Sequence, residues 1–394
     1  MNCRHCGRLV ETPFVDLGAA PPSNAYLTED RLSQPEKWLP LRVLVCTSCW
    51  LVQTEDFVDV SELFEADYAY FSSISASWRR HAEHYVETMV ERFALHQASK
   101  IVEVAANDGY LLEHTLRRGI PSLGIEPTAA TAAAARAKGI EIVQDFFGVR
   151  LARELASQGQ RADLMVANNV LAHVPDINDF VAGFAVLLTQ NGVATFEFPH
   201  LINLVRFNQF DSIYHEHYSY LSLTAVAEIF DANGLQVFDI EKFTTHGGSL
   251  RVFAQRKDSG AQIVTDNVAS MLEHEHMLGL RDDQYYRGFQ AHAERAKDDF
   301  VAFLIEAKRA GKRVCAYGAA AKGNTFMNFA GIRSDLISFV VDRSPSKQNK
   351  FMPGSRIPIV AEDRIRAEEP DYIVVLPWNL FDEIAQQLSY VDRS

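Results

Sequence analysis

The densest group of side chains able to transfer protons is the stretch FDSIYHEHYSYLS at residues 210–222. It holds two histidines, one glutamate and three tyrosines. An imidazole titrates near neutral pH, and His217 is therefore predicted to act as a general base. Tyr214 lies three residues earlier and would share a face with it in a helical turn. Its hydroxyl could stabilise a developing oxyanion or exchange roles with His217, and Glu216 could bind a substrate hydroxyl or orient an imidazole.

Four of the five cysteines form two CxxC pairs, Cys3 with Cys6 and Cys46 with Cys49. Each pair places two thiolates on one tight turn, and two such turns complete a tetrahedral site suited to Zn²⁺. Four thiolates leave no open coordination position, which predicts a structural rather than a catalytic zinc. Disulfides are the alternative, disfavoured because the chain starts without a secretory signal pattern. Cys315 lies in an apolar run and is interpreted as a small buried hydrophobic residue.

Composition and charge exclude several classes of function. The chain has 394 residues, 47% of them hydrophobic, and a formal net charge of -13. Because no basic block interrupts this negative charge, a nucleic acid is not expected as a partner. No run of 18 apolar residues and no signal peptide pattern occurs, which predicts a cytoplasmic protein without a membrane partner. A small anion remains compatible with the charge, because backbone amides at a helix start can hold phosphate.

From about residue 68 the sequence alternates helix and strand patterns, which is typical of a parallel sheet with crossover helices. Strands are expected at 101–105, 122–127, 141–145, 162–169 and 193–198, and helices at 78–95, 111–118, 129–138 and 150–156. Ser222 is a predicted N-cap for a further helix that ends at Asn233–Gly234, followed by a hairpin of strands 235–243 and 249–256. Five parallel strands, a helix and a hairpin form the layout of a class I, Rossmann-like methyltransferase domain. Residues 210–222 are then an insertion at the carboxyl edge of the sheet, where open α/β folds bind ligands.

Acidic residues at the ends of the first three strands indicate where S-adenosylmethionine would bind. The first strand leads into Glu103-Val-Ala-Ala-Asn-Asp-Gly109, a weak version of a glycine-rich turn. Glu126 follows Gly109 by 17 residues and is placed to accept both ribose hydroxyls. Asp145 could accept from the adenine amine, with Phe146 or Phe147 stacked on the ring, although each acid alone could equally cap the next helix. The predicted cofactor-binding residues are Glu103, Ala105, Asn107, Gly109, Glu126, Asp145, Phe146 and Asn168.

The carboxyl-terminal third reads as a helical bridge, residues 262–310, followed by a second and smaller doubly wound α/β unit. In the turn from Tyr317 to Thr325, backbone amides at a helix start and the cation of Lys322 could bind a pyrophosphate. A purely structural role for this turn is the alternative. The predicted organisation is a zinc module at 1–66, a methyltransferase domain at 67–260 and a Rossmann-like domain with its helical bridge at 261–394.

These motifs together resemble the bacterial sugar C-methyltransferases that act on nucleotide-linked 4-keto-deoxysugars in deoxysugar biosynthesis. The resemblance rests on the paired CxxC module, VEVAANDGYLL, NNVLAHV, IYHEH, THGGSLRV and AYGAAAKGNT, and it covers essentially the whole chain. One departure is Asn349 in KQNKFMPG, where a glycine is more usual in that family.

The resemblance implies a zinc module, a domain for S-adenosylmethionine and a carboxyl-terminal domain that helps to hold the nucleotide. It also implies that His173 and Tyr68 face the reacting sugar, with Asn169 nearby. Carbon methylation would need a base to remove the proton at C3, next to the C4 ketone, while the enolate is held. The predicted substrate-binding residues are Asn169, Lys322, Asn324 and Thr325.

Alternative interpretations stay open for both the stretch and the chain. The stretch 210–222 could be a hydrogen-bonded lid that only orders a long loop, in which His215 and His217 are structural. A histidine metal site there is disfavoured, because proton transfer followed by methyl attack requires no metal. The chain as a whole could be an O- or N-methyltransferase, or a zinc-containing scaffold that binds S-adenosylmethionine without turnover.

Overall fold

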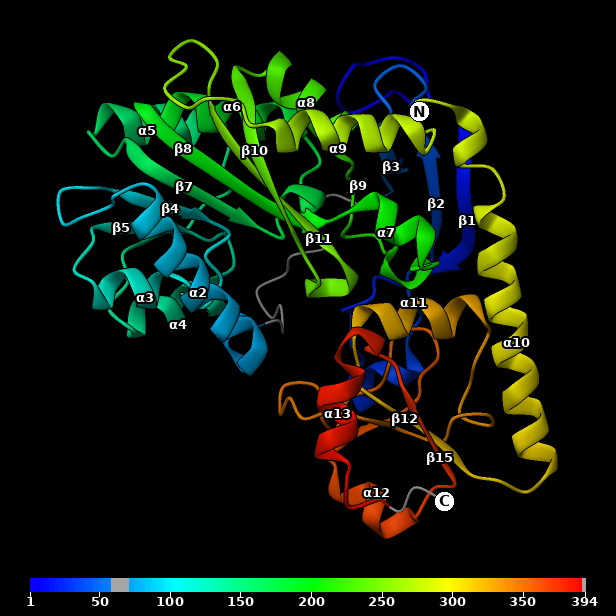
Figure 1. Ribbon diagram of the computed structural model, residues 1–394. Helices are drawn as coiled ribbons and strands as arrows, with labels where there is room; N and C mark the ends of the chain where they lie inside the picture. Colours follow the sequence, from blue (N-terminus) through cyan, green and yellow to red (C-terminus); the bar gives the residue numbers. More distant parts are fainter. Residues whose placement is uncertain (58–70, 392–394) are drawn as a thin grey trace.

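The computed structural model describes residues 1–57 and 71–391, arranged around three sheets (Figure 1). The predicted site residue Tyr68 lies outside the described residues. The largest sheet has seven strands in the order β10-β11-β8-β7-β4-β5-β6. Its strands are β4 (Ile101–Val104), β5 (Ser122–Ile125), β6 (Ile142–Val143), β7 (Ala162–Asn168), β8 (Leu188–Pro199), β10 (Leu235–Phe243) and β11 (Ser249–Arg256).

Strand directions in this sheet confirm the predicted class I methyltransferase layout. Strands β6, β5, β4, β7 and β8 pair in parallel, and β11 and β10 continue the sheet in antiparallel pairing. The helices around it are α2 (Ala76–Arg92), α3 (Leu112–Arg117), α4 (Ala129–Ala137), α5 (Val149–Ser157), α6 (Ile177–Leu187), α7 (Leu201–Arg206) and α8 (Leu223–Ala232). The predicted N-cap is confirmed, because the Ser222 hydroxyl accepts a hydrogen bond from the Ala225 amide at 3.1 Å.

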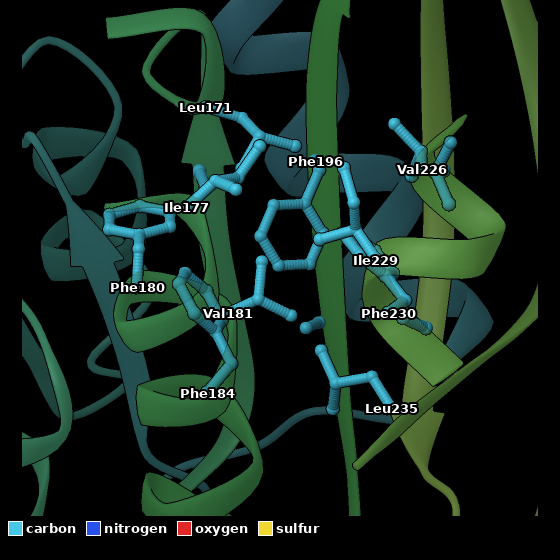
Figure 2. Close-up of a cluster of buried hydrophobic side chains, with 14 of the residues drawn as sticks. Leu171, Ile177, Phe180, Val181, Phe184, Phe196, Val226, Ile229, Phe230 and Leu235 are labelled. Carbon is cyan, nitrogen blue, oxygen red and sulfur yellow. The ribbon is translucent and has the colours of Figure 1, made fainter. Parts of the chain in front are cut away.

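Helix α6 is not among the elements expected from the sequence, and β8 begins before its predicted start. Asp176 caps α6 by accepting from the amide of Asp179. Apolar side chains cover so much of the helix surface that its face toward the sheet does not stand out from the pattern. In Figure 2 the aromatic rings of α6 and α8 meet Phe196 of β8, with ring centroids 4.6 Å apart for both Phe184 and Phe230. This packing buries the central strands of the methyltransferase sheet.

The amino-terminal sheet takes one of its strands from the insertion. Its order is β1-β2-β3-β9, with β1 (Thr12–Ala20), β2 (Leu39–Val45), β3 (Val52–Thr54) and β9 (Ser219–Tyr220). Val52 pairs with Tyr220 and Gln53 with Ser219 in antiparallel register. Because β9 directly follows the predicted catalytic residues, the insertion and the cysteine module share one hydrogen-bonded unit.

The carboxyl-terminal sheet is parallel throughout, with the order β14-β13-β12-β15. Its elements and the preceding bridge are α9 (Asp266–Met277), α10 (Phe289–Arg309), β12 (Val314–Tyr317), α11 (Ala321–Phe329), β13 (Val340–Val341), β14 (Ile359–Val360), α12 (Asp363–Glu368), β15 (Tyr372–Val375) and α13 (Phe381–Gln387). The chain order reverses beside β12, as expected of a doubly wound unit. Asn349 has a φ of 61°. Glycine adopts a positive φ without strain, which explains why the sugar C-methyltransferases usually have glycine at this position. Among the described residues, no helix is both long and apolar enough to cross a bilayer.

A buried ion pair ties the antiparallel edge of the large sheet to its centre. Arg251 of β11 and Glu197 of β8 are directly opposite in register, with Nη2 and Oε2 2.7 Å apart. His81 of α2 also lies 2.9 Å from the same carboxylate oxygen. Burial alone would raise the pKa of Glu197, but the hydrogen bond with His81 and the charge of Arg251 lower it to about 2.

Replacing Arg251 by methionine is expected to lower the free energy of unfolding by about 3 kcal/mol, because Glu197 then remains buried without its cation. Urea denaturation followed by circular dichroism measures the loss. The matched control is Arg256→Met on the same strand, whose ion pair with Asp258 lies at the surface, and its loss should be small. Equal losses in the two variants would contradict the importance assigned to the buried pair.

Candidate active site

The predicted catalytic stretch lies at the centre of the molecule, where α7, β9 and α11 meet (Figure 1). It begins with a short 3-10 helix, Phe210–Ser212, and continues through a tight turn into β9. The amide of His217 donates to the carbonyl of Tyr214 at 2.9 Å. The stretch is therefore a single turn rather than a helix, but it brings the two rings together as predicted, with centroids 3.9 Å apart.

Two hydrogen bonds define the tautomer of His217. Its Nδ1 lies 2.9 Å from the carbonyl oxygen of Ser212, which can only accept. In the neutral imidazole Nδ1 therefore carries the hydrogen, and Nε2 accepts from the Tyr214 hydroxyl 2.7 Å away. His217 is buried and Tyr214 only half-buried, so the phenol is the more accessible member of the pair. The pair can accept a proton at the Tyr214 oxygen and pass the phenol proton to His217.

His173 lies beside this pair. It ends the 3-10 helix Leu171–His173 after β7, and its ring contacts that of His217 edge-on with a centroid distance of 4.6 Å. Burial lowers the pKa of His173 to about 4, although a hydrogen bond at the Glu216 backbone partly opposes this effect. His173 is thus a neutral imidazole at pH 7.

Glu216 and His215 point toward the amino-terminal module. The Asn24 amide donates to the carboxylate of Glu216 at 2.7 Å, and His215 Nε2 lies 3.1 Å from the carbonyl oxygen of Pro40. The structure thus brings Tyr214, His217 and His173 into one group, whereas the side chains of Glu216 and His215 contact the module.

The predicted cofactor loop has an unusual backbone. Ala105 and Asn107 have positive φ values of 59° and 50°, and Gly109 one of 75°. The positive φ of Gly109 favours glycine, and a Cβ there would also displace the end of the Ile140 side chain. Such conformations cost energy for non-glycine residues and concentrate at binding sites.

Glu126 braces this loop. Its carboxylate accepts from the amide of Asn107 at 2.9 Å and from the amide of Thr128, at the start of α4, at 2.9 Å. Burial, followed by the charges of Glu126 and Asp108, raises the pKa of Glu103 well above its usual value, and a hydrogen bond from Tyr110 opposes the shift. Glu103 of β4, Asp108 of the loop and Glu126 after β5 are therefore close enough for their charges to interact.

Asn168 and Asn169 end β7 at the same edge of the sheet. Both polar atoms of the Asn168 side chain are buried without a hydrogen-bond partner, and so is Oδ1 of Asn169, whose φ is 54°. Unpaired buried amides are costly, about 1–3 kcal/mol each. Such groups suit a site that a polar ligand completes, and they fit S-adenosylmethionine and a hydroxylated substrate.

The third predicted acid is partly engaged by a neighbour on α5. Asp145 forms an ion pair with Arg150 at 2.5 Å. Phe147 packs against Phe180 and Phe184, whereas Phe146 is 48% exposed. Of the two phenylalanines, Phe146 is the one with a face available for stacking.

The turn before α11 approaches the catalytic stretch from the carboxyl-terminal domain. Gly318 has a φ of 90°, and a Cβ there would clash with the ring of Pro377. Thr325 donates its hydroxyl to the carbonyl of Ile213 at 2.8 Å, so its side chain braces the catalytic stretch. Asn324 is fully buried, and neither polar atom of its side chain has a hydrogen-bond partner.

Lys322 lies in a polar cluster that the sequence did not indicate. Burial lowers its pKa, while the negative charge of Asp211 opposes the shift. Its Nζ lies 4.8 Å from the ring centroid of Trp378, and Trp378 Nε1 donates to Asp211 at 2.7 Å. Asp211 lies in the stretch 210–222 and Trp378 follows β15. The two residues are 167 positions apart, so no sequence spacing could have predicted their contact.

Cys3, Cys6, Cys46 and Cys49 converge as their spacing predicts. Their sulfur atoms all lie within 4.8 Å of one another, and the Cys3–Cys49 and Cys6–Cys46 distances are both 3.5 Å. A tetrahedral zinc with Zn–S bonds of about 2.3 Å requires sulfur separations of about 3.8 Å. The four thiolates therefore fit a structural Zn²⁺ ion without rearrangement of the turns.

Three family descriptions match the chain in consecutive segments. Residues 3–64 match the family described as "Putative zinc binding domain", residues 78–240 match "Methyltransferase domain", and residues 244–394 match "C-methyltransferase C-terminal domain". The C-methyltransferase NovU of Streptomyces niveus is 33% identical over 383 residues, which cover 97% of this chain and 91% of NovU. The chain belongs to the C-methyltransferase family.

Two solved structures resemble about half of this chain. Magnesium protoporphyrin IX methyltransferase from Synechocystis PCC 6803 with bound SAM is 15% identical, with a TM-score of 0.35, over 45% of this chain and 79% of that one. The PH0226 protein from Pyrococcus horikoshii OT3 is 14% identical, with a TM-score of 0.40, over 51% of this chain and 100% of that one.

Family membership confirms the predicted activity class and cofactors. The chain is an S-adenosylmethionine-dependent C-methyltransferase with a zinc-binding module. The roles of individual residues in this C-methyltransferase stay predictions.

Zinc content should depend on the four converging thiolates. We expect about one zinc ion per chain in the purified protein and a strong loss in Cys46→Ser, because a hydroxyl is a poor zinc ligand. Elemental analysis by mass spectrometry measures the ratio. The control Cys315→Ala, in β12 of the carboxyl-terminal domain, should retain zinc. Equal zinc content in Cys46→Ser and wild type would contradict the site.

His173 should remain neutral throughout pH 5 to 8. Its folded pKa of about 4 lies below the unfolded value of about 6.5. The unfolded chain therefore binds this proton more readily, and the contribution of His173 to stability falls as the pH drops from about 6.5 toward 4. A ¹³C NMR titration of the histidine rings checks the prediction, with His173→Gln used for assignment. A His173 signal that titrates near pH 6.5 would contradict it.

Proposed function

We propose that this enzyme transfers a methyl group to C3 of a nucleotide-linked 4-keto-deoxysugar. The observation that carries the proposal is the Tyr214–His217 pair, in which a half-buried phenol donates to an unprotonated imidazole nitrogen. A carbon next to a ketone is acidic enough for such a pair to deprotonate it, whereas methylation of an oxygen or nitrogen atom requires no carbon acid. The named activity of the relative NovU, C-methylation, supports the same chemistry.

The proposed reaction begins with proton removal. The C3–H bond breaks, its proton goes to the Tyr214 oxygen, and the phenol proton passes to His217 Nε2. The electron pair of the broken bond forms an enolate with its negative charge on O4. The side-chain amide of Asn169 would donate to this oxygen, with the neutral imidazole of His173 beside the Tyr214–His217 pair.

Carbon–carbon bond formation completes the turnover. When bound, S-adenosylmethionine supplies an electrophilic methyl group on its sulfonium sulfur. The cofactor would be held at the carboxyl edge of β4 and β7, next to the catalytic turn, by the loop at 105–109 together with Glu126 and Asn168. The methyl group that the cofactor would supply would become bonded to C3 as its bond to sulfur breaks, and His217 would then release its proton to solvent.

We further propose that the start of α11 binds the pyrophosphate of the substrate. Lys322 supplies a cation, and the unpaired amide of buried Asn324 supplies a donor. Asp145 and Phe146 would contact the adenine of the cofactor, and Glu216 a sugar hydroxyl. Because four thiolates bind zinc best where they stay reduced, the cytoplasm is the proposed location.

Mass spectrometry of products after incubation with 4-keto-6-deoxysugar nucleotides and labelled cofactor tests the substrate class. In deuterium oxide without cofactor, the enzyme should also exchange the C3 proton of its substrate. Turnover without such exchange would favour an O- or N-methyltransferase. Binding of S-adenosylmethionine without turnover of any acceptor would favour a scaffold.

Tyr214→Phe and His217→Gln are each expected to lower kcat by about 10²–10⁴-fold with normal cofactor binding, because each interrupts the proton relay. Steady-state kinetics and calorimetric titration of the cofactor measure the two quantities. The matched control is His215→Gln in the same turn, since the glutamine amide can still donate to the Pro40 carbonyl. If His215→Gln loses as much activity as His217→Gln, the stretch acts as a loop-ordering lid and the relay is wrong.

A further inference from the structure

Arg4 of the cysteine module extends toward the segments that carry the catalytic histidines. It stands between Cys3 and Cys6, and its side chain is only 5% exposed. One guanidinium nitrogen donates to the carbonyl of Thr54 at 2.9 Å, and another to the carbonyl of Pro175 at 3.0 Å. The Asp56 carboxylate forms an ion pair with the Arg4 guanidinium, with Oδ1 and Nη2 2.7 Å apart.

Each of these two carbonyls belongs to a segment that carries a catalytic histidine. Pro175 follows His173 by two residues. Thr54 is the last residue of β3, and its hydroxyl donates to the carbonyl of His217 at 3.1 Å. A single guanidinium therefore connects the segments of both histidines.

Tyr218 completes this connection. The Thr54 amide donates to the Tyr218 carbonyl at 3.1 Å, and the Tyr218 amide donates to the carbonyl of Ala172, next to His173, at 2.8 Å. The Tyr218 ring lies under the Arg4 guanidinium, 5.1 Å from its central carbon. The Arg4 side chain thus lies over the place where the two histidine segments touch.

The zinc site holds the main chain that carries this side chain. The Arg4 amide donates to the Gln53 side chain at 2.9 Å, and Gln53 in turn donates to the sulfur of Cys3 at 3.2 Å. With zinc bound, Cys3 before Arg4 and Cys6 after it are both attached to the metal, which fixes the main chain of the turn between them. A planar guanidinium with five donors can serve two divergent carbonyls, whereas a lysine ammonium is a point charge that cannot span them.

We propose that Arg4 is a positioning residue for the reaction: through Thr54 and Pro175 it sets the separation of the His217 and His173 rings. The zinc module then acts on catalysis as well as on stability. The assignment of catalytic roles to the two histidines rests on the proposed function, but the positioning by Arg4 does not. Loss of the Arg4 fork keeps both histidines in the chain but frees their segments to shift relative to each other.

The test compares Arg4→Gln and Arg4→Lys with the control Arg8→Gln. Arg8 belongs to the same cysteine module but is exposed and contacts Ser48 at its surface. Zinc content, melting temperature and cofactor affinity are measured for all three variants, so that a simple loss of folding is recognised. The ¹³C NMR signals of the His173 and His217 rings are then recorded without substrate, assigned with His173→Gln and His217→Gln.

Both Arg4 variants should keep zinc and cofactor binding yet shift the two ring signals, and Arg8→Gln should leave them unchanged. With substrate, kcat of Arg4→Gln should fall by about 10- to 100-fold while KM changes little, as expected of misplacement by about 1 Å. Unchanged ring signals in both Arg4 variants, or equal shifts in Arg8→Gln, would overturn the proposal. If wild type turns over no ketosugar nucleotide, the proposed substrate fails, and the ring signals still decide the role of Arg4.

Discussion

The short antiparallel pairing of β3 with β9 is the constraint on which the rest of the site depends. It joins a strand that starts three residues after Cys49 to a strand that starts two residues after His217. Backbone hydrogen bonds tolerate little change in register, because a slip by one residue would reverse every side chain of β9. The cysteine module therefore determines where the proposed catalytic turn lies relative to the methyltransferase sheet.

Burial gives the site its chemical character. A hydrogen bond joins Tyr214 to His217 and burial keeps His173 neutral at pH 7, while Glu197 is held in an ion pair with Arg251. A low local dielectric strengthens each of these interactions and penalises any that is left incomplete. The unpaired amides at Asn168 and Asn324 are two such incomplete groups, which a polar ligand would complete.

Much of this arrangement could be predicted from local patterns. Alternating helix and strand signals predicted the parallel sheet, the Ser222 cap predicted the start of α8, and two CxxC pairs predicted four converging thiolates. Helix α6 escaped prediction because apolar residues surround it too evenly for a periodic pattern to emerge. The Asp211–Trp378 hydrogen bond escaped because it joins distant segments that share no motif.

By itself, the sequence determined the chemical groups available: thiolates for zinc, an imidazole beside a phenol, and acids at the ends of successive strands. Those features depend on residue type and short spacing, which local conformation is enough to express. Only the tertiary structure decided that Arg4 contacts the segments of both His173 and His217, and that β9 belongs to the sheet of the cysteine module. Contacts of this kind arise when the chain packs, because burial of apolar surface brings distant polar groups together and then requires each of them to find a partner.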